Sequence, residues 1–123
     1  MDRHRMLVVE DDRTTCDLLR AIFAHMGWDV DVAETVAEGL AGLDPPPDLL
    51  VLDVTLPDGD GTDILRKVRS DHLPTRVAVT TGHDPGMLTA LASLRPDALL
   101  QKPIEVEDVC RAYDRRADLV GSE

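Results

Sequence analysis

The chain has 123 residues, which is enough for one domain with a buried core and too few for two ordinary domains. Hydrophobic residues make up 43% of it and aromatic residues 2%, so the core must be built mainly from aliphatic side chains. A formal net charge of -11 makes direct binding of nucleic acid unfavourable, because the phosphates would repel such a surface.

The cysteines and the apolar runs indicate a cytoplasmic protein. Cys16 and Cys110 lie far apart and lack C-x-x-C spacing, which argues against a disulfide framework and against a zinc site. No apolar run approaches the ~20 residues that a membrane span needs. The run after the basic N-terminus is also too short for the core of a signal peptide. We therefore expect no membrane partner.

Five short apolar segments are bounded by turn residues, as buried strands are, and each precedes a segment with helical periodicity. In chain order, the predicted strands are residues 6–9, 28–32, 49–52, 77–80 and 98–100. The predicted helices are residues 13–26, 34–43, 62–70, 85–94 and 105–119. The segment 57–61, rich in Asp and Gly, is predicted as a loop. We expect one domain over residues 1–120 and a tail at 121–123.

The strict alternation of strands and helices predicts the fold. Short connections favour right-handed crossovers and a parallel sheet with helices on both faces. Five strands do not close a barrel. We therefore expect an α/β, (βα)5 flavodoxin-like doubly wound open sheet with strand order 2-1-3-4-5. Strands one and three are neighbours in that order, and ligands bind such sheets at the carboxyl edge where the winding direction switches.

Reactive or charged side chains follow four of the five predicted strands. Glu10 and Asp11 follow the first strand, and Asp53 ends the third. Three carboxylates packed together repel one another, which raises their pKa values. A hard cation such as Mg2+ removes that cost and leaves coordination positions for phosphate oxygens. Thr81 brings a hydroxyl and Lys102 an ammonium to the same edge.

Four segments together carry a family resemblance. They are residues 8–12 (Val-Val-Glu-Asp-Asp), 52–61 (Leu-Asp-Val-Thr-Leu-Pro-Asp-Gly-Asp-Gly), 80–82 (Thr-Thr-Gly) and 102–103 (Lys-Pro). In this order and at these spacings they resemble the receiver domain of bacterial two-component response regulators, the CheY-like domain. The resemblance covers essentially the whole chain.

The resemblance implies a phosphoacceptor with a metal site. Asp53 matches the carboxylate that takes a phosphoryl group from a histidine kinase or a phosphotransfer protein. Glu10 and Asp11 match the acidic pair, of which Asp11 binds Mg2+ directly and Glu10 through water. The backbone carbonyl of Thr55 matches a further ligand, and Mn2+ is a substitute metal. The same resemblance implies no enzyme activity beyond Mg-dependent self-phosphorylation and self-dephosphorylation.

The resemblance also implies a switch. Thr81 and Lys102 match the residues that contact the phosphate and draw their loops inward. Receivers often carry an aromatic residue three positions before the lysine, where this chain has Leu99, so the usual coupling of hydroxyl and aromatic is in question. Thr55 and His83 occupy positions that influence the lifetime of the acyl phosphate, although the preferred interpretation of His83 is a solvated loop residue. A downstream effector and a phosphorylation-dependent dimer are the further partners implied.

Two other functions remain as alternatives. A phosphohydrolase of the haloacid-dehalogenase type needs a second Asp two residues after the nucleophile, where this chain has Thr55, and a cap domain that does not fit the length. A receiver-like interaction module that signals without phosphorylation gains weight from Leu99. The acids Glu10, Asp11 and Asp53, together with Thr81 and Lys102, argue against that module.

Other acidic residues have simpler interpretations. Asp12 is expected to cap the first helix. Asp58 and Asp60 superficially resemble part of a calcium-binding loop. Asp63 stands where such a loop needs glycine and Arg69 where it needs glutamate, so Asp58 and Asp60 are interpreted as turn formers.

Overall fold

A computed structural model describes residues 3–82, 91 and 93–121, with side chains described as far as residue 114. Its main sheet has five parallel strands in the order β2-β1-β3-β6-β7. The strands are β1 (Arg5–Val9), β2 (Asp29–Ala33), β3 (Leu49–Asp53), β6 (Arg76–Thr81) and β7 (Ala98–Gln101). This is the predicted order 2-1-3-4-5, so the doubly wound fold is confirmed.

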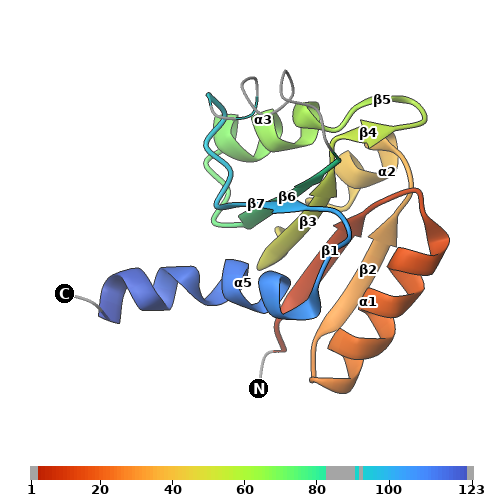
Figure 1. Cartoon of the computed structure of the whole chain (residues 1–123). Helices are drawn as coiled ribbons and strands as arrows, with labels where there is room; N and C mark the ends of the chain where they lie inside the picture. The colour runs from red at the N-terminus through yellow and green to blue at the C-terminus, as the bar shows by residue number, and fades with distance from the viewer. Residues whose placement is uncertain (1–2, 83–90, 92, 122–123) are drawn as a thin grey trace.

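The helices cover both faces of the sheet (Figure 1). They are α1 (Arg13–His25), α2 (Val36–Ala41), α3 (Thr62–Ser70) and α5 (Val106–Gly121). α1 and α5 pack on one face, and α2 and α3 pack on the other. The helix predicted at residues 85–94 and the final residues of the predicted tail lie largely outside the described residues.

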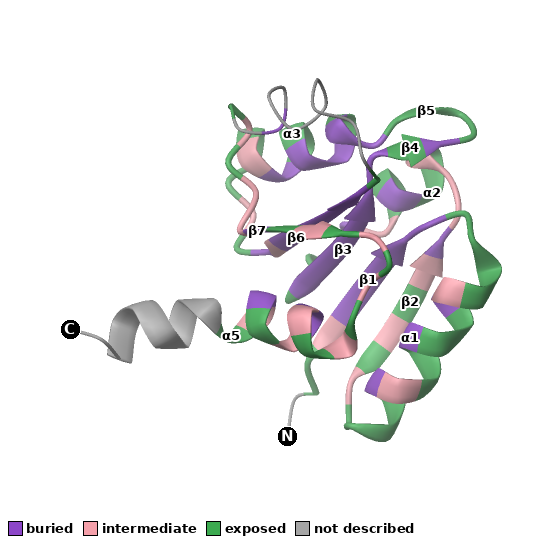
Figure 2. Cartoon of the chain, in the orientation of Figure 1, coloured by how far each residue is buried: buried purple, intermediate pink, exposed green. Residues whose placement is uncertain are grey.

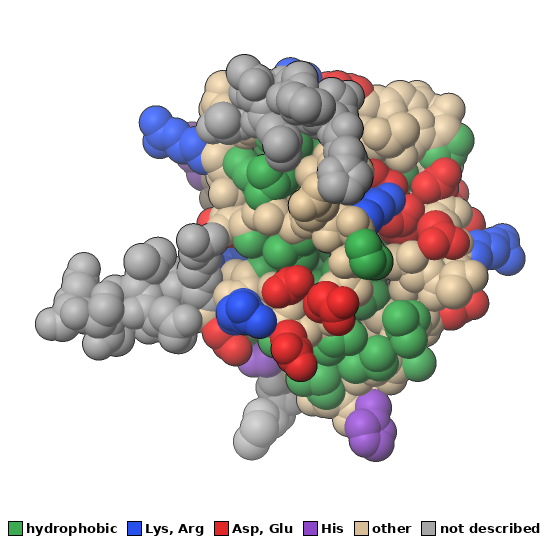
Figure 3. All heavy atoms as spheres, viewed as in Figure 1, with side chains coloured by type: hydrophobic (Ala, Val, Ile, Leu, Met, Phe, Trp, Pro, Cys, Tyr) green, Lys and Arg blue, Asp and Glu red, His purple; other side chains and the backbone are tan. Residues whose placement is uncertain are grey.

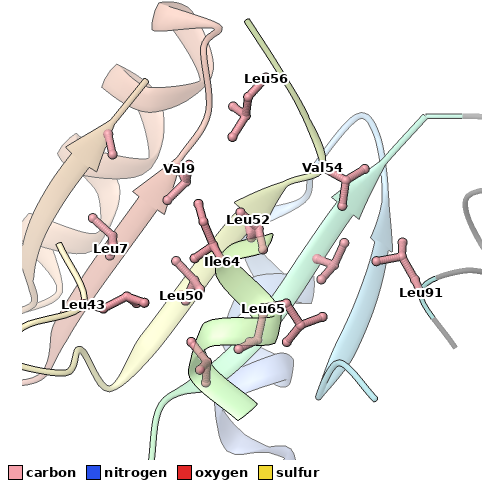
Figure 4. Close-up of a cluster of buried hydrophobic side chains, with 14 residues drawn as sticks. Leu7, Val9, Leu43, Leu50, Leu52, Val54, Leu56, Ile64, Leu65 and Leu91 are labelled. Carbon is pink, nitrogen blue, oxygen red and sulfur yellow. The ribbon is translucent and has the colours of Figure 1, made fainter. Parts of the chain in front are cut away.

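Alternating side chains of the inner strands supply two cores. Leu7, Val9, Leu50 and Leu52 point toward α2 and α3, where they meet Ile64 and other apolar side chains (Figure 4). Met6, Val8 and Val51 point the other way, toward α1 and α5. β1, β3 and most of β6 are buried, whereas the edge strand β2 is partly exposed (Figure 2). Both faces of the inner strands are covered by helices, and this is why these strands appear in the sequence as continuous apolar runs.

Two segments differ from the sequence-based prediction. The predicted loop after β3 contains a short antiparallel hairpin, β4 (Thr55–Leu56) and β5 (Gly59–Asp60). Helix α2 is shorter than predicted: it begins two residues later, at Val36, because the Thr35 hydroxyl accepts the N–H of Glu38 and caps the helix, and it ends two residues earlier, at Ala41. Neither difference changes the topology.

Acidic side chains gather in two places on the face that Figure 3 shows, over α5 and beside the carboxyl end of β1. The first turn of α5 contributes Glu107 and Asp108. The second group lies at the edge of the sheet where the exposed Asp11 follows β1. The charge is thus concentrated partly at the predicted site.

Candidate functional site

The carboxyl ends of the parallel strands bring the predicted site residues to one edge of the sheet. Asp53 is the last residue of β3, Glu10 and Asp11 directly follow β1, and Lys102 directly follows β7. Across the β3–β6 pair, Asp53 is aligned with Thr80. The strand order therefore places all four charged side chains around the switch between β1 and β3, as predicted.

The three carboxylates form a compact cluster. One carboxylate oxygen each of Glu10, Asp11 and Asp53 lie within 4.8 Å of one another. Glu10 is 3% and Asp53 4% exposed, whereas Asp11 faces solvent. The Lys102 ammonium reaches into the cluster, with Nζ 2.9 Å from Asp53 Oδ2 and 3.2 Å from Glu10 Oε1. One cation thus serves two buried carboxylates.

Burial and neighbouring charges perturb the titration of Glu10 and Lys102. Burial, and then the neighbouring Asp53 carboxylate, raise the pKa of Glu10 to about 7, against the opposing effects of the Asp12 N–H and Lys102. Burial by itself would lower the pKa of Lys102, but the carboxylates of Asp53 and Glu10 outweigh it and raise that pKa. The cluster therefore carries more negative charge than Lys102 compensates.

Glu10 Oε1 indicates where further compensation is missing. This oxygen is buried and accepts no hydrogen bond from the described residues, although the Lys102 ammonium lies within ion-pair distance. The other oxygen, Oε2, accepts the N–H of Asp12 at 3.1 Å. A buried carboxylate oxygen without a hydrogen bond, next to two further carboxylates, fits a hard divalent cation.

Hydrogen bonds from neighbouring groups hold the two buried acids, Asp53 and Glu10, in place. The Thr55 N–H donates to Asp53 Oδ1 at 3.0 Å, opposite the lysine contact. The Cys16 thiol, on α1, donates to the Glu10 carbonyl at 3.2 Å. Burial and nearby carboxylates raise the pKa of Cys16 to about 11, so this thiol stays protonated and supports Glu10 without being reactive.

The predicted switch residues occupy the neighbouring strands. Thr81 ends β6 and is buried, and its hydroxyl donates to the Gly82 carbonyl at 3.4 Å. The Lys102 N–H donates to the Thr81 carbonyl at 2.9 Å, which ties the two loops together. Leu99, on β7, is 44% exposed. His83 lies outside the described residues.

The Asp-rich loop contains contacts that the sequence interpretation missed. Asp12 caps α1 through Thr14, as predicted, and Asp60 accepts the N–H of Thr62 in the local manner of a turn former. Asp58, in contrast, accepts two N–H groups from α2, so describing it as a turn former was incomplete.

The sequence interpretation also missed the close approach of Gly61 to the backbone of Asp53 and Val54. A Cβ at this residue would lie 2.3 Å from the carbonyl oxygen of Asp53 and 2.9 Å from Val54 Cα. The absence of a side chain lets the start of α3 approach the end of β3. A glycine soon after a predicted strand-end acid is the signal that could have indicated this close approach.

Comparisons with known proteins identify the family of this chain. The family model for the response regulator receiver domain matches residues 6–114. The chain belongs to this family. The receiver domain is 38% identical to the transcriptional regulatory protein TrcR of Mycobacterium tuberculosis over 108 residues, covering 85% of this chain and 42% of TrcR. It is 34% identical over 114 residues to the acid tolerance regulatory protein ActR of Rhizobium meliloti, and the match covers 90% of this chain and 58% of ActR.

A solved structure extends the agreement to the whole fold. A CheY-like response regulator receiver domain protein from Methanospirillum hungatei has a TM-score of 0.86 at 26% identity, with 98% of each chain covered. The receiver domain spans about half the length of the curated relatives it matches. These findings confirm the predicted family and its place in two-component signalling, and the family is not one of catalytic enzymes. Among the described residues, no helix is long and apolar enough to cross a membrane.

Proposed function

We propose that Asp53 accepts a phosphoryl group from the phosphohistidine of a histidine kinase or phosphotransfer protein. The observation that carries this proposal is the position of Asp53, which is buried at the end of β3 with Lys102 2.9 Å from its carboxylate and Glu10 and Asp11 beside it. Thr55 and Lys102 hold the two carboxylate oxygens from opposite sides, so the nucleophile is oriented before the donor arrives.

The transfer itself exchanges one bond for another. A carboxylate oxygen of Asp53 attacks the phosphorus, the P–N bond to the donor imidazole breaks, and the nitrogen keeps the bonding electrons. The product is an acyl phosphate. Lys102 is placed to pair with the charge on the transferring oxygens, and it would move from the carboxylate toward the new phosphate.

The acidic cluster suits Mg2+, with Mn2+ as a substitute. Glu10, Asp11 and Asp53 supply hard oxygen ligands, and the backbone carbonyl of Thr55 is the further protein ligand we propose. When bound, the cation would neutralise the carboxylates and the phosphoryl oxygens. With the cation bound, the domain would also phosphorylate itself from small phosphodonors and dephosphorylate itself by hydrolysis.

The proposed switch involves β6 and β7. The Thr81 hydroxyl, now bonded to Gly82, would turn to the phosphate, and the backbone bond from Lys102 to Thr81 would move both loops together. Leu99, already 44% exposed, offers an aliphatic side chain where an aromatic one is common, so the switch rests on the two loops. A downstream effector or a phosphorylation-dependent dimer would recognise this surface. The free thiols of Cys16 and Cys110 fit the reducing cytoplasm in which we place the domain.

Labelling with acetyl phosphate and Mg2+ tests the proposal. The wild type should gain one phosphoryl group by intact-mass spectrometry, and Asp53→Asn should gain none. Asp63→Asn, which changes an exposed carboxylate on α3, should label like the wild type. Beryllofluoride with Mg2+ should shift the NMR signals of Thr81 and Lys102. Unchanged spectra and labelling that survives Asp53→Asn would refute the phosphoacceptor and favour an interaction module that signals without phosphorylation.

A further inference from the structure

Asp58 connects the loop after Asp53 to a different part of the chain. It lies in the turn between β4 and β5, and its Oδ1 accepts the N–H of Val36 at 2.7 Å. Its Oδ2 accepts the N–H of Ala37 at 3.2 Å. Val36 and Ala37 open α2, where backbone N–H groups have no partner within the helix. Figure 1 shows the hairpin beside α2. The carboxylate therefore fastens the two segments to each other.

On the hairpin side, this contact leads to the phosphoacceptor. β4 and β5 pair so that Thr55 is aligned with Asp60, and the Thr55 N–H donates to Asp53 Oδ1 at 3.0 Å. The hairpin is closed at its base by the Gly61 N–H, which donates to the Val54 carbonyl at 2.9 Å. The position of the hairpin therefore sets the position of the Thr55 backbone beside Asp53.

On the side of α2, the same contact leads to the acidic pair. The N–H of Glu10 donates at 2.9 Å to the carbonyl of Ala33, which lies two residues before the cap of α2. Glu34, the next residue, lies 3.4 Å from the guanidinium of Arg13 at the start of α1. The segment before α2 is thus held against the loop that carries Glu10 and Asp11.

We propose that Asp58 is a positioning residue for the divalent cation site. It closes a chain of contacts that runs from Glu10 through Ala33 and the start of α2 to the hairpin and Asp53. Lys102 joins the same two acids on the opposite side, toward β7. Without Asp58, the pairing of β1 and β3 would still hold Glu10 near Asp53, but the hairpin that carries Thr55 would lose its connection to the segment before α2. This inference rests on the proposed function, in which Thr55 and the acids hold the cation.

Calorimetric titration with Mg2+ tests the inference on the whole chain. Asp58→Ala should weaken Mg2+ binding by about tenfold, the lower end of the effect of residues that orient metal ligands. Asp58→Asn, which keeps one oxygen acceptor, should fall between Asp58→Ala and the wild type. Asp63→Ala is the matched control, because it removes an exposed carboxylate from the next helix. It should change the affinity by no more than roughly twofold, since surface charges are screened by salt.

Hydrogen exchange supplies a readout that does not depend on the metal. The amides of Val36 and Ala37 should exchange faster in Asp58→Ala than in Asp63→Ala. Equal protection of these amides, equal Mg2+ affinity in Asp58→Ala and the wild type, or an equal loss in Asp63→Ala would overturn the inference. A wild type that does not bind Mg2+ would overturn the proposed function instead. If Asp58→Ala is unfolded by circular dichroism, Asp58→Asn carries the same comparisons.

Discussion

Gly61→Ala tests whether the close approach of α3 to the phosphoacceptor strand is essential. Gly61 has φ -60° and ψ -19°, a helical conformation that alanine adopts without strain. Replacing glycine at such a position stabilises a protein by about 0.4–1 kcal/mol through the unfolded state. The new Cβ, however, would meet the Asp53 carbonyl oxygen at 2.3 Å and Val54 Cα at 2.9 Å. Both are backbone atoms, so neither can rotate away.

The steric term is the larger one. Relieving the contact requires β3 and the start of α3 to separate by about 1 Å, and overpacking of this kind costs about 1–3 kcal/mol. We therefore expect a net loss of about 1–2 kcal/mol in the free energy of unfolding. Because the displaced carbonyl belongs to Asp53, labelling by acetyl phosphate should slow as well.

Urea unfolding measures this loss through the fluorescence of Trp28, the single tryptophan. Trp28 packs edge-on against Tyr113, with ring centroids 5.0 Å apart, and should report the loss of packing. Gly82→Ala is the control, because a Cβ at Gly82 meets no atom within 4 Å of the described residues. It should change the free energy of unfolding by less than about 0.5 kcal/mol. Equal stability of Gly61→Ala and the wild type, or an equal loss in Gly82→Ala, would refute the steric argument.

Two further predictions concern the charges of the site. Both are measured as the free energy of unfolding in the presence of a metal chelator, unless Mg2+ is added. The pKa of Glu10 rises from 4.5 to about 7 on folding, so the folded state holds an extra proton between these values. For this group, stability is greatest below pH 4.5 and declines as the pH rises to about 7. Glu10→Gln should flatten that decline, and an unchanged pH profile would contradict the assignment. Lys102→Ala should cost about 1–2 kcal/mol, a buried-pair value reduced because the lysine is partly exposed. Mg2+ should restore most of this loss, whereas Lys67→Ala, at an exposed ion pair, should cost less than ~0.5 kcal/mol.

The sheet and the charged edge could be predicted because side chains encode both. Apolar runs such as Leu49–Asp53 are buried from end to end, and the acid closing that run lies where a parallel strand must open into a loop. Lys102 follows a strand whose neighbour is fixed by the crossover rule. These signals need no knowledge of the loops, so strand order and the convergence of the acids followed from the sequence.

The missed contacts involve backbone groups, which leave little trace in a sequence. Asp58 bonds to the N–H groups of Val36 and Ala37, and any residue except proline in their place would offer the same donors. The start of α2 did have a signal, because Thr35 and Glu38 form the pattern of a capping box. The Glu38 N–H bonds to the Thr35 hydroxyl at 3.1 Å, and reading this pattern would have shortened the predicted helix.

The charges of the site explain why its separate features belong together. If all three carboxylates lose their protons, they and the Lys102 ammonium leave two uncompensated negative charges, which is the charge that a divalent cation neutralises. Without the cation, the rise in the pKa of Glu10 shows part of the cost of holding these groups together. A fixed framework is needed to keep them close despite that repulsion, and Gly61, Thr55 and Asp58 each join the loop after β3 to that framework. The loop after Asp53 therefore holds the charged groups in position, while the carboxyl ends of β1, β3 and β7 supply the charged side chains.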